Sequence, residues 1–159
     1  DELADEETIS AIPYDDYKNI KYVSSTEEFI DALVSDTLII LEPGIYDLTD
    51  YYTEVTKFKN RNVKFKEYEG ITISKLKHVG IYANDGNVLT QIVEEDPECS
   101  VLIFDGCNDI TISGIVFGHT EQEEYVCSGD VLEFRKTNDI FLENLKHQPM
   151  NLQCLCQIL

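Results

Sequence analysis

Hydrophobic and polar positions alternate along short runs of this chain, and the runs return at a fixed distance. The runs at 101–104 and 110–112 reappear at 131–134 and 140–142, an offset of 30 positions. A weaker copy covering residues 71–81 lies 31 positions upstream of the first. Short alternating runs rich in Val, Ile, Thr and Phe predict β-strands. Repeats of about 20 to 50 residues predict a solenoid, whose units bury their apolar faces against their neighbours.

The residues between the runs predict tight corners. Asp-Gly at 105–106 and Asn-Asp at 108–109 tolerate positive φ angles, and Asn-Asp in the middle of a helix would be unfavourable. No stretch between these strands is long enough for a crossover helix, so we expect parallel strands stacked one coil above the next. The expected stacked pairs are Phe104 with Phe134 and Asn108 with Asn138.

Two further elements are expected ahead of the repeats. A strand at 37–41, a corner at Pro43-Gly44 and a second strand at 45–48 have the order of an opening coil. Upstream, Ser25 with Glu28 three residues later forms a capping box, which predicts a short amphipathic helix. We expect this helix to cover the end of the solenoid, where apolar side chains and strand edges are otherwise exposed.

Together these features resemble a right-handed parallel β-helix of the pectin-lyase-like superfamily. The resemblance covers residues 37–148, and Asn108 and Asn138 resemble rungs of the asparagine ladder found in that family. The earliest copy has Lys77-His78 in place of Asn-Asp, so the ladder is expected to start late. The resemblance implies an all-β solenoid of about four coils with a short N-terminal capping α-helix.

The sequence then divides into four parts. We expect an acidic leader or linker at 1–20, a capping segment with the helix at 21–36, the coils at 37–148 and an atypical tail at 149–159. The tail lacks glycine and an Asn-Asp corner. Two interpretations stay open: a chain that ends early, or a divergent capping segment. Either leaves a strand edge at the last coil that allows self-association.

Charge narrows the classes of partner. The net charge is −19, and residues 1–17 contain seven acids and no base. Such a surface repels phosphate backbones and anionic lipid, which disfavours nucleic-acid binding. The sequence contains no run of about 18 apolar residues, so we do not expect a segment that inserts into a membrane. The chain begins with Asp1 rather than Met, so we expect a removed signal peptide and a secreted or cell-surface bacterial protein.

Five cysteines are present, too few for a disulfide scaffold. Cys99 and Cys127 precede matching strands and are expected near the same corner of adjacent coils, where a disulfide is geometrically allowed. Cys107 occupies an inward position and is expected to be a small buried hydrophobic residue.

One predicted loop carries candidate chemistry. His119 leaves a strand and leads into an acidic segment with Glu121, Glu124 and Tyr125. Loops on a rigid scaffold are common binding sites, so these four residues are the candidate ligand-binding set. The alternative is a solvated acidic loop with an incidental histidine. A second candidate is a set of tyrosines that could be platforms on which sugar rings stack: Tyr51, Tyr52, Tyr68, Tyr82 and Tyr125. The alternative is that they only occupy exposed sheet faces and loops, where tyrosine is common.

The resemblance also implies that an enzymatic function has to be considered, because the family includes enzymes. Polysaccharide lyases of this fold use calcium held by aspartates, and its hydrolases use paired carboxyls. Neither signature can be placed on this sequence, so we assign no catalytic residue and no cofactor; calcium held by stacked aspartates is the alternative. We expect a non-catalytic module that binds a glycan or a surface partner. A fragment of a lyase or glycosidase and a purely structural or adhesin scaffold remain the alternatives.

Overall fold

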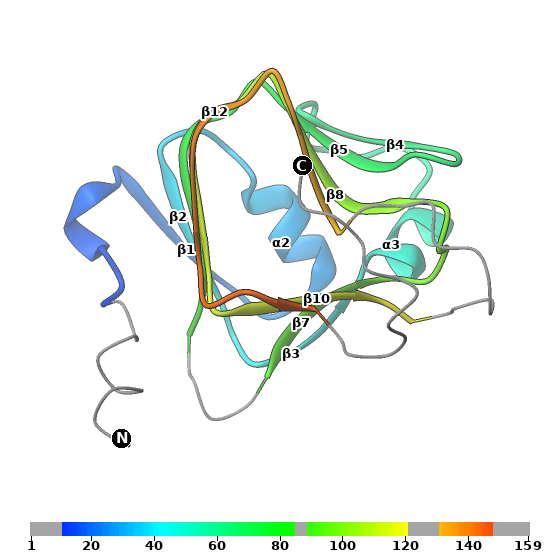
Figure 1. The fold of residues 1–159 in the computed structure, drawn as a ribbon, viewed down its shortest axis with the longest axis horizontal. Helices are drawn as coiled ribbons and strands as arrows, with labels where there is room; N and C mark the ends of the chain where they lie inside the picture. The colour runs from blue at the N-terminus through cyan, green and yellow to red at the C-terminus, as the bar shows by residue number, and fades with distance from the viewer. Residues whose placement is uncertain (1–10, 85–88, 121–130, 148–159) are drawn as a thin grey trace.

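The protein is mostly β-structure in parallel sheets (Figure 1). The computed structural model describes residues 11–84, 89–120 and 131–147. Within them lie three sheets, and no sheet closes on itself. None of the helices in these ranges is long and apolar enough to cross a membrane.

Each sheet takes its strands from distant parts of the chain. Sheet A has the order β1 (Asn19–Val23), β2 (Thr37–Leu41), β6 (Lys77–Ala83), β9 (Asn108–Ser113) and β12 (Asn138–Glu143). Sheet B has the order β13 (Lys146–His147), β10 (Ile115–His119), β7 (Thr90–Glu94) and β3 (Gly44–Asp47). Sheet C has the order β11 (Leu132–Arg135), β8 (Ser100–Asp105), β5 (Gly70–Ser74) and β4 (Val63–Lys66). All neighbours are parallel except β4 and β5, which form an antiparallel hairpin.

The predicted stacked pairs are confirmed. Phe104 of β8 is in register with Phe134 of β11, and their rings stack with centroids 5.4 Å apart. Asn108 of β9 is in register with Asn138 of β12, and Lys77 of β6 precedes them in the same row. The repeat therefore sets the register of the parallel strands.

Apolar side chains from all three sheets meet in one core. The inward residues of sheet A include Ile39, Ile81 and Ile112, each fully buried. Cys107 is also buried in this core, as the sequence predicts. The core is fully closed around Phe104, while Phe134 in the last strand of sheet C is only partly buried.

The predicted N-terminal helix is present as α2 (Thr26–Ala32). Its capping box forms, because the Ser25 hydroxyl accepts a hydrogen bond from the backbone N–H of Glu28 at 3.1 Å. Phe29 and Ile30 are completely buried in the main core. In the view of Figure 1 α2 overlaps the space that the sheets surround; the elements it contacts are β1 and β2, at the edge where sheet A begins, and α3, so it lies at the N-terminal end of the sheets.

The predicted strand at 45–48 is wrong at its end. The strand β3 stops at Asp47, and a second helix, α3 (Leu48–Glu54), follows. The Asp47 carboxylate accepts hydrogen bonds from the backbone N–H groups of Thr49 and Asp50, at 3.0 and 3.3 Å. A side chain that accepts hydrogen bonds from these free N–H groups favours the start of a helix. This cap is the physical reason why a helix, and not a longer strand, follows Asp47.

The N-terminal segment is part of the folded structure from residue 11 onward. The expected leader boundary at residue 20 falls inside β1. Residues 12–18, called the strap below, include the short 3-10 helix η1 (Tyr14–Asp16). Ile12 and Tyr17 pack on three buried residues of the outer face of sheet A, which are Leu38, Ile40 and Tyr82. Tyr82 is therefore not the exposed platform that the sequence suggests.

Candidate functional site

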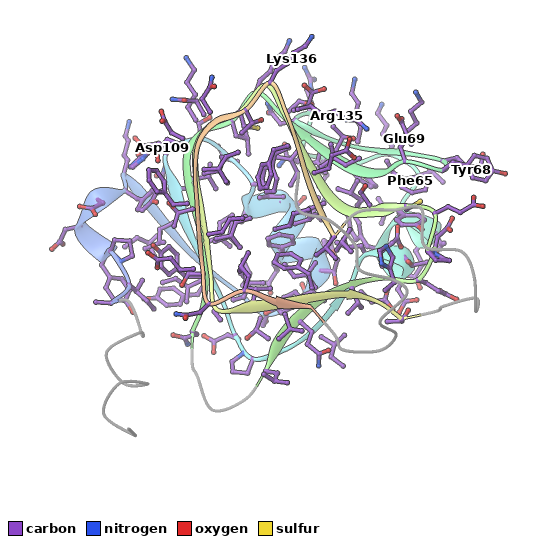
Figure 2. All side chains as sticks on the ribbon, in the orientation of Figure 1. Phe65, Tyr68, Glu69, Asp109, Arg135 and Lys136 are labelled. Carbon is purple, nitrogen blue, oxygen red and sulfur yellow. The ribbon has the colours of Figure 1, made fainter. Side chains whose placement is uncertain are left out.

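The β4–β5 hairpin is where the chain departs from the parallel arrangement. It projects from the corner of the body in Figure 1. Its turn closes with a hydrogen bond from the Glu69 N–H to the Lys66 carbonyl at 3.0 Å. Tyr68 lies in this turn with 66% of its surface exposed, and Figure 2 shows its ring at the tip, directed away from the body.

Tyr68 adopts a backbone conformation that is unusual for its residue type. Its φ angle is 65°, in the left-handed region. Glycine and asparagine are the usual residues there, because a bulky side chain is strained in that region. The turn therefore presents an exposed aromatic ring at a local conformational cost.

The hairpin is packed against the rest of the protein close to its turn. The Phe65 ring stacks on Tyr52 of α3, with centroids 3.7 Å apart and planes 13° apart. Gly70 has a φ of 113°, and a Cβ there would overlap the Ser100 carbonyl oxygen. Only glycine allows this close approach of β5 to β8. The hairpin is thus a supported projection, which suits it to present a binding residue.

Charged groups surround the hairpin on the side of sheet C. The Glu69 carboxylate lies 3.1 Å from the Lys66 ammonium and 3.8 Å from the Arg135 guanidinium. Arg135 also donates from Nε to Glu133 at 2.8 Å, and this bond raises its pKa further above the ordinary value. Donors and acceptors that can bind hydroxyl groups therefore lie in the hairpin turn that carries Tyr68 and on the neighbouring part of sheet C.

The candidate set in the predicted loop is only partly described. His119 is the last residue of β10 and is 2% exposed. Its Nε2 lies 2.6 Å from the Cys99 carbonyl oxygen and donates to it, and burial lowers the pKa of the ring. Its partners Glu121, Glu124 and Tyr125 lie outside the described residues, so the ligand-binding set stays a prediction.

The same holds for the expected disulfide, because Cys127 also lies outside the described residues. Cys99 itself is buried, with its Sγ 3.6 Å from the Asp96 carboxylate, which accepts from the thiol. Burial raises the pKa of this thiol to about 12. At neutral pH it stays protonated, so it is not an activated nucleophile.

A buried carboxyl that sequence reasoning missed lies beside Tyr52, the residue on which Phe65 of the hairpin stacks. Glu94 ends β7 and is completely buried. Its Oε2 accepts hydrogen bonds from the Thr49 hydroxyl, from the Tyr52 hydroxyl at 3.1 Å and from the Glu95 N–H at 2.9 Å. Burial is the largest influence on its pKa, which is raised. Glu94 thus joins α3 to sheet B, and its position after the apolar pair Ile92-Val93 is the only signal in the sequence.

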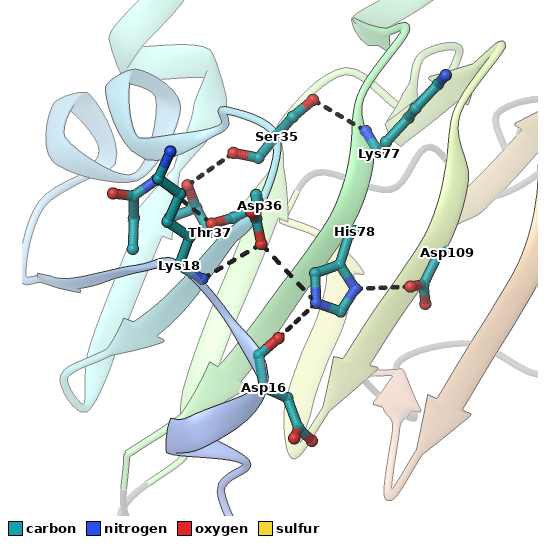
Figure 3. Close-up of polar contacts among 9 residues, drawn as sticks. Asp16, Lys18, Ser35, Asp36, Thr37, Lys77, His78 and Asp109 are labelled. Atoms are coloured by element: carbon teal, nitrogen blue, oxygen red, sulfur yellow. Dashed lines mark hydrogen bonds and ion pairs between the residues drawn. The ribbon is translucent and has the colours of Figure 1, made fainter.

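A second cluster of polar residues lies at the corner where the chain enters the strands of sheet A. Asp36, His78, Asp109 and Asp139 all have φ angles between 56° and 59°, and they occupy one row of successive strands. His78 is the central member of the cluster in Figure 3. Its Nδ1 lies 2.6 Å from Asp109 Oδ2, and its Nε2 lies 2.7 Å from the Asp16 carbonyl oxygen.

These polar groups do not form a metal centre. Within residues 11–84, 89–120 and 131–147, no group of three or more His, Cys, Asp or Glu side chains is placed to hold a metal ion.

Comparisons with protein-family models, with curated proteins and with solved structures found no match to this chain.

Proposed function

We propose that the three sheets are the faces of a right-handed parallel β-helix of the pectin-lyase type. In support, Phe104 pairs with Phe134, 30 positions on, and Ile81 pairs with Ile112, 31 positions on. The chain also passes repeatedly from sheet C to sheet A to sheet B, which is the order expected of successive coils. An experimental structure is the test, and coils that rise in the left-handed sense would overturn this assignment.

We further propose that the protein is an exported or cell-surface module that binds a glycan without catalysing a reaction on it. The observation that carries the proposal is Tyr68, a largely exposed aromatic ring held in a strained turn on a supported projection. Strained backbone is concentrated at functional positions, and tyrosine combines an apolar face with a polar hydroxyl. A sugar ring offers the matching surface, with an apolar face and hydroxyl groups at its edge.

The neighbouring charges fit the same type of ligand. Lys66 and Glu69 of the hairpin, with Arg135 paired to Glu69, are partly or largely exposed and supply both donors and acceptors in the region of the turn. Stacking on Tyr68 would give the affinity, and these polar groups would orient the sugar.

The test is binding of the purified protein to an array of polysaccharides and oligosaccharides, followed by titration of any hit. Tyr68→Asn is the informative variant, because asparagine tolerates the left-handed region while it lacks the ring. We expect it to lose about tenfold in affinity, or about 1.4 kcal/mol. Tyr22→Asn is the matched control, since Tyr22 of β1 is 57% exposed but lies on sheet A.

Each outcome decides between the candidates. Binding that Tyr68→Asn weakens and Tyr22→Asn does not would support the hairpin site. Binding that neither change affects would place the glycan elsewhere, and an array without any hit would favour a scaffold or adhesin. Release of unsaturated uronate or reducing ends, assayed with and without added calcium, would show an enzyme and overturn the non-catalytic proposal.

A further inference from the structure

One histidine of sheet A contacts the strap at two points. The His78 ring stacks on the Tyr17 ring, with centroids 4.2 Å and planes 13° apart. Its two nitrogens contact two different parts of the molecule: Asp109 on β9 and the backbone carbonyl of Asp16 in η1 (Figure 3). His78 therefore bridges the strap and sheet A.

The geometry requires a proton on both ring nitrogens. A carboxylate oxygen and a carbonyl oxygen can only accept hydrogen bonds, so both contacts need an N–H from the imidazole. A neutral ring has one N–H and would leave the other nitrogen facing an acceptor lone pair. Consistent with this, the hydrogen bonds to Asp16 and Asp109 raise the pKa of His78.

The sheet is shaped to receive the strap. A Cβ at Gly80 of β6 would lie 2.8 Å from the Tyr17 hydroxyl, so the missing side chain makes room for this ring. A side-chain hydrogen bond joins Tyr17 to Thr111 of β9. Further along, the Lys18 N–H donates to the Asp36 carboxylate at 3.2 Å, and the Asn19 N–H donates to the Asp36 carbonyl at 3.1 Å.

We propose that His78 is a pH-sensitive latch, which holds the strap on the outer face of sheet A when doubly protonated and loosens it on losing a proton. Loosening uncovers the apolar face of Leu38, Ile40 and Tyr82 that Ile12 and Tyr17 cover. The device is thus a cover over an apolar surface, controlled by one charge.

His78 is the group in this cluster that changes charge near neutral pH. The groups that face it are the carboxylates of Asp36 and Asp109, the strap residues Asp16 and Tyr17, and the neighbouring Lys18 and Lys77. Between about pH 5.5 and about pH 9, aspartates are ionised and lysines protonated. Burial raises the pKa of Tyr17 above its ordinary value, so it stays neutral in that range.

The sign follows from linkage. A histidine whose pKa is higher in the bound arrangement stabilises that arrangement fully below its free pKa of about 6.5, and the stabilisation is lost as pH rises through the raised pKa. The strap should therefore be held at low pH and released at high pH.

Hydrogen exchange of the full chain, normalised to the intrinsic rate at each pH, is the test. We expect the protection of the Lys18 and Asn19 amides to fall several-fold from about pH 5.5 to about pH 9, relative to the Ile112 amide inside sheet A. His78→Asn is the key variant, because asparagine accepts the φ of 58° at this position and carries no titrating group. It should show low strap protection at both pH values.

A second measurement separates a latch from a merely structural histidine. The NMR titration of His78, assigned by its loss in His78→Asn, should have a midpoint above that of a free histidine, and Asp109→Asn should lower it. A wild-type strap whose relative protection is independent of pH would overturn the proposal. So would an unchanged pH dependence in His78→Asn, and so would a His78 midpoint at or below the free value.

Discussion

At the scale of single residues, Glu94 shows how much of the polar chemistry is set by burial. The Thr49 and Tyr52 hydroxyls and one backbone N–H donate to one carboxyl oxygen, while the other, Oε1, has no hydrogen-bond partner in the described part of the chain. Hydrogen bonds favour the ionised carboxylate, but burial disfavours it more strongly. The net result is a carboxyl whose pKa is raised in the folded state.

The sign of the stability effect can be predicted from that direction. A raised pKa means that the contribution of Glu94 is fully present below its unfolded pKa of about 4.3 and is lost as pH rises through the folded value. Glu94→Gln removes this titration, so its free energy of unfolding should decline less between about pH 4 and about pH 8 than that of the wild type. Urea unfolding at both pH values measures this difference. The exposed Glu54→Gln is the control, and equal declines in all three proteins would contradict the prediction.

At the scale of elements, the sequence predicts α2 and the repeated strands but not α3. The capping box Ser25/Glu28 and the recurring Asn-Asp corners are local signals, and short-range signals of this kind can be recognised without tertiary structure. Helix α3 has no comparable pattern, and its Tyr51 and Tyr52 are interpreted from the sequence only as candidate stacking platforms. In the structure Tyr51 is buried and Tyr52 packs on Phe65 of the hairpin. These contacts join distant segments, so no local pattern predicts them.

The capping of α3 provides a prediction at this scale. Among the described residues, Asp47 is the one whose side chain caps the free N–H groups at the start of α3, and loss of such a cap costs about 1 kcal/mol. Asp47→Ala should therefore lower the free energy of unfolding by about that amount. It should also weaken the support of the hairpin, since α3 carries Tyr52. Asp50→Ala, in the first turn of the helix and exposed, is the matched control and should change stability by less than about 0.5 kcal/mol. The two variants are compared by chemical unfolding, and equal losses would show that the cap is not what begins this helix.

At the scale of the whole molecule, the period of the sequence matches the register of the repeated strands, β5 with β8 and β11 in sheet C and β6 with β9 and β12 in sheet A, because parallel strands in register bury the same side chains in each layer. Phe104 over Phe134 and Asn108 over Asn138 could be predicted for this reason. The strap and the hairpin could not, because both are single departures from the period. Their positions depend on distant partners such as Gly80 for the strap and Ser100 for the hairpin.

A comparison of Phe104 in sheet C with Phe141 in sheet A tests whether one core is continuous along the molecule. Phe104 is completely buried between layers, and its ring contacts Phe134. Phe141 of β12 is 53% exposed on the outer face of sheet A. Phe104→Ala should cost about 3 to 5 kcal/mol because it leaves a cavity, whereas Phe141→Ala should stay within about 0.5 kcal/mol. If Phe104→Ala does not fold, Phe104→Leu should still cost more than Phe141→Leu. Equal losses at the two positions would mean that the layers do not share one core, because burial between layers is the only difference in environment that the prediction uses.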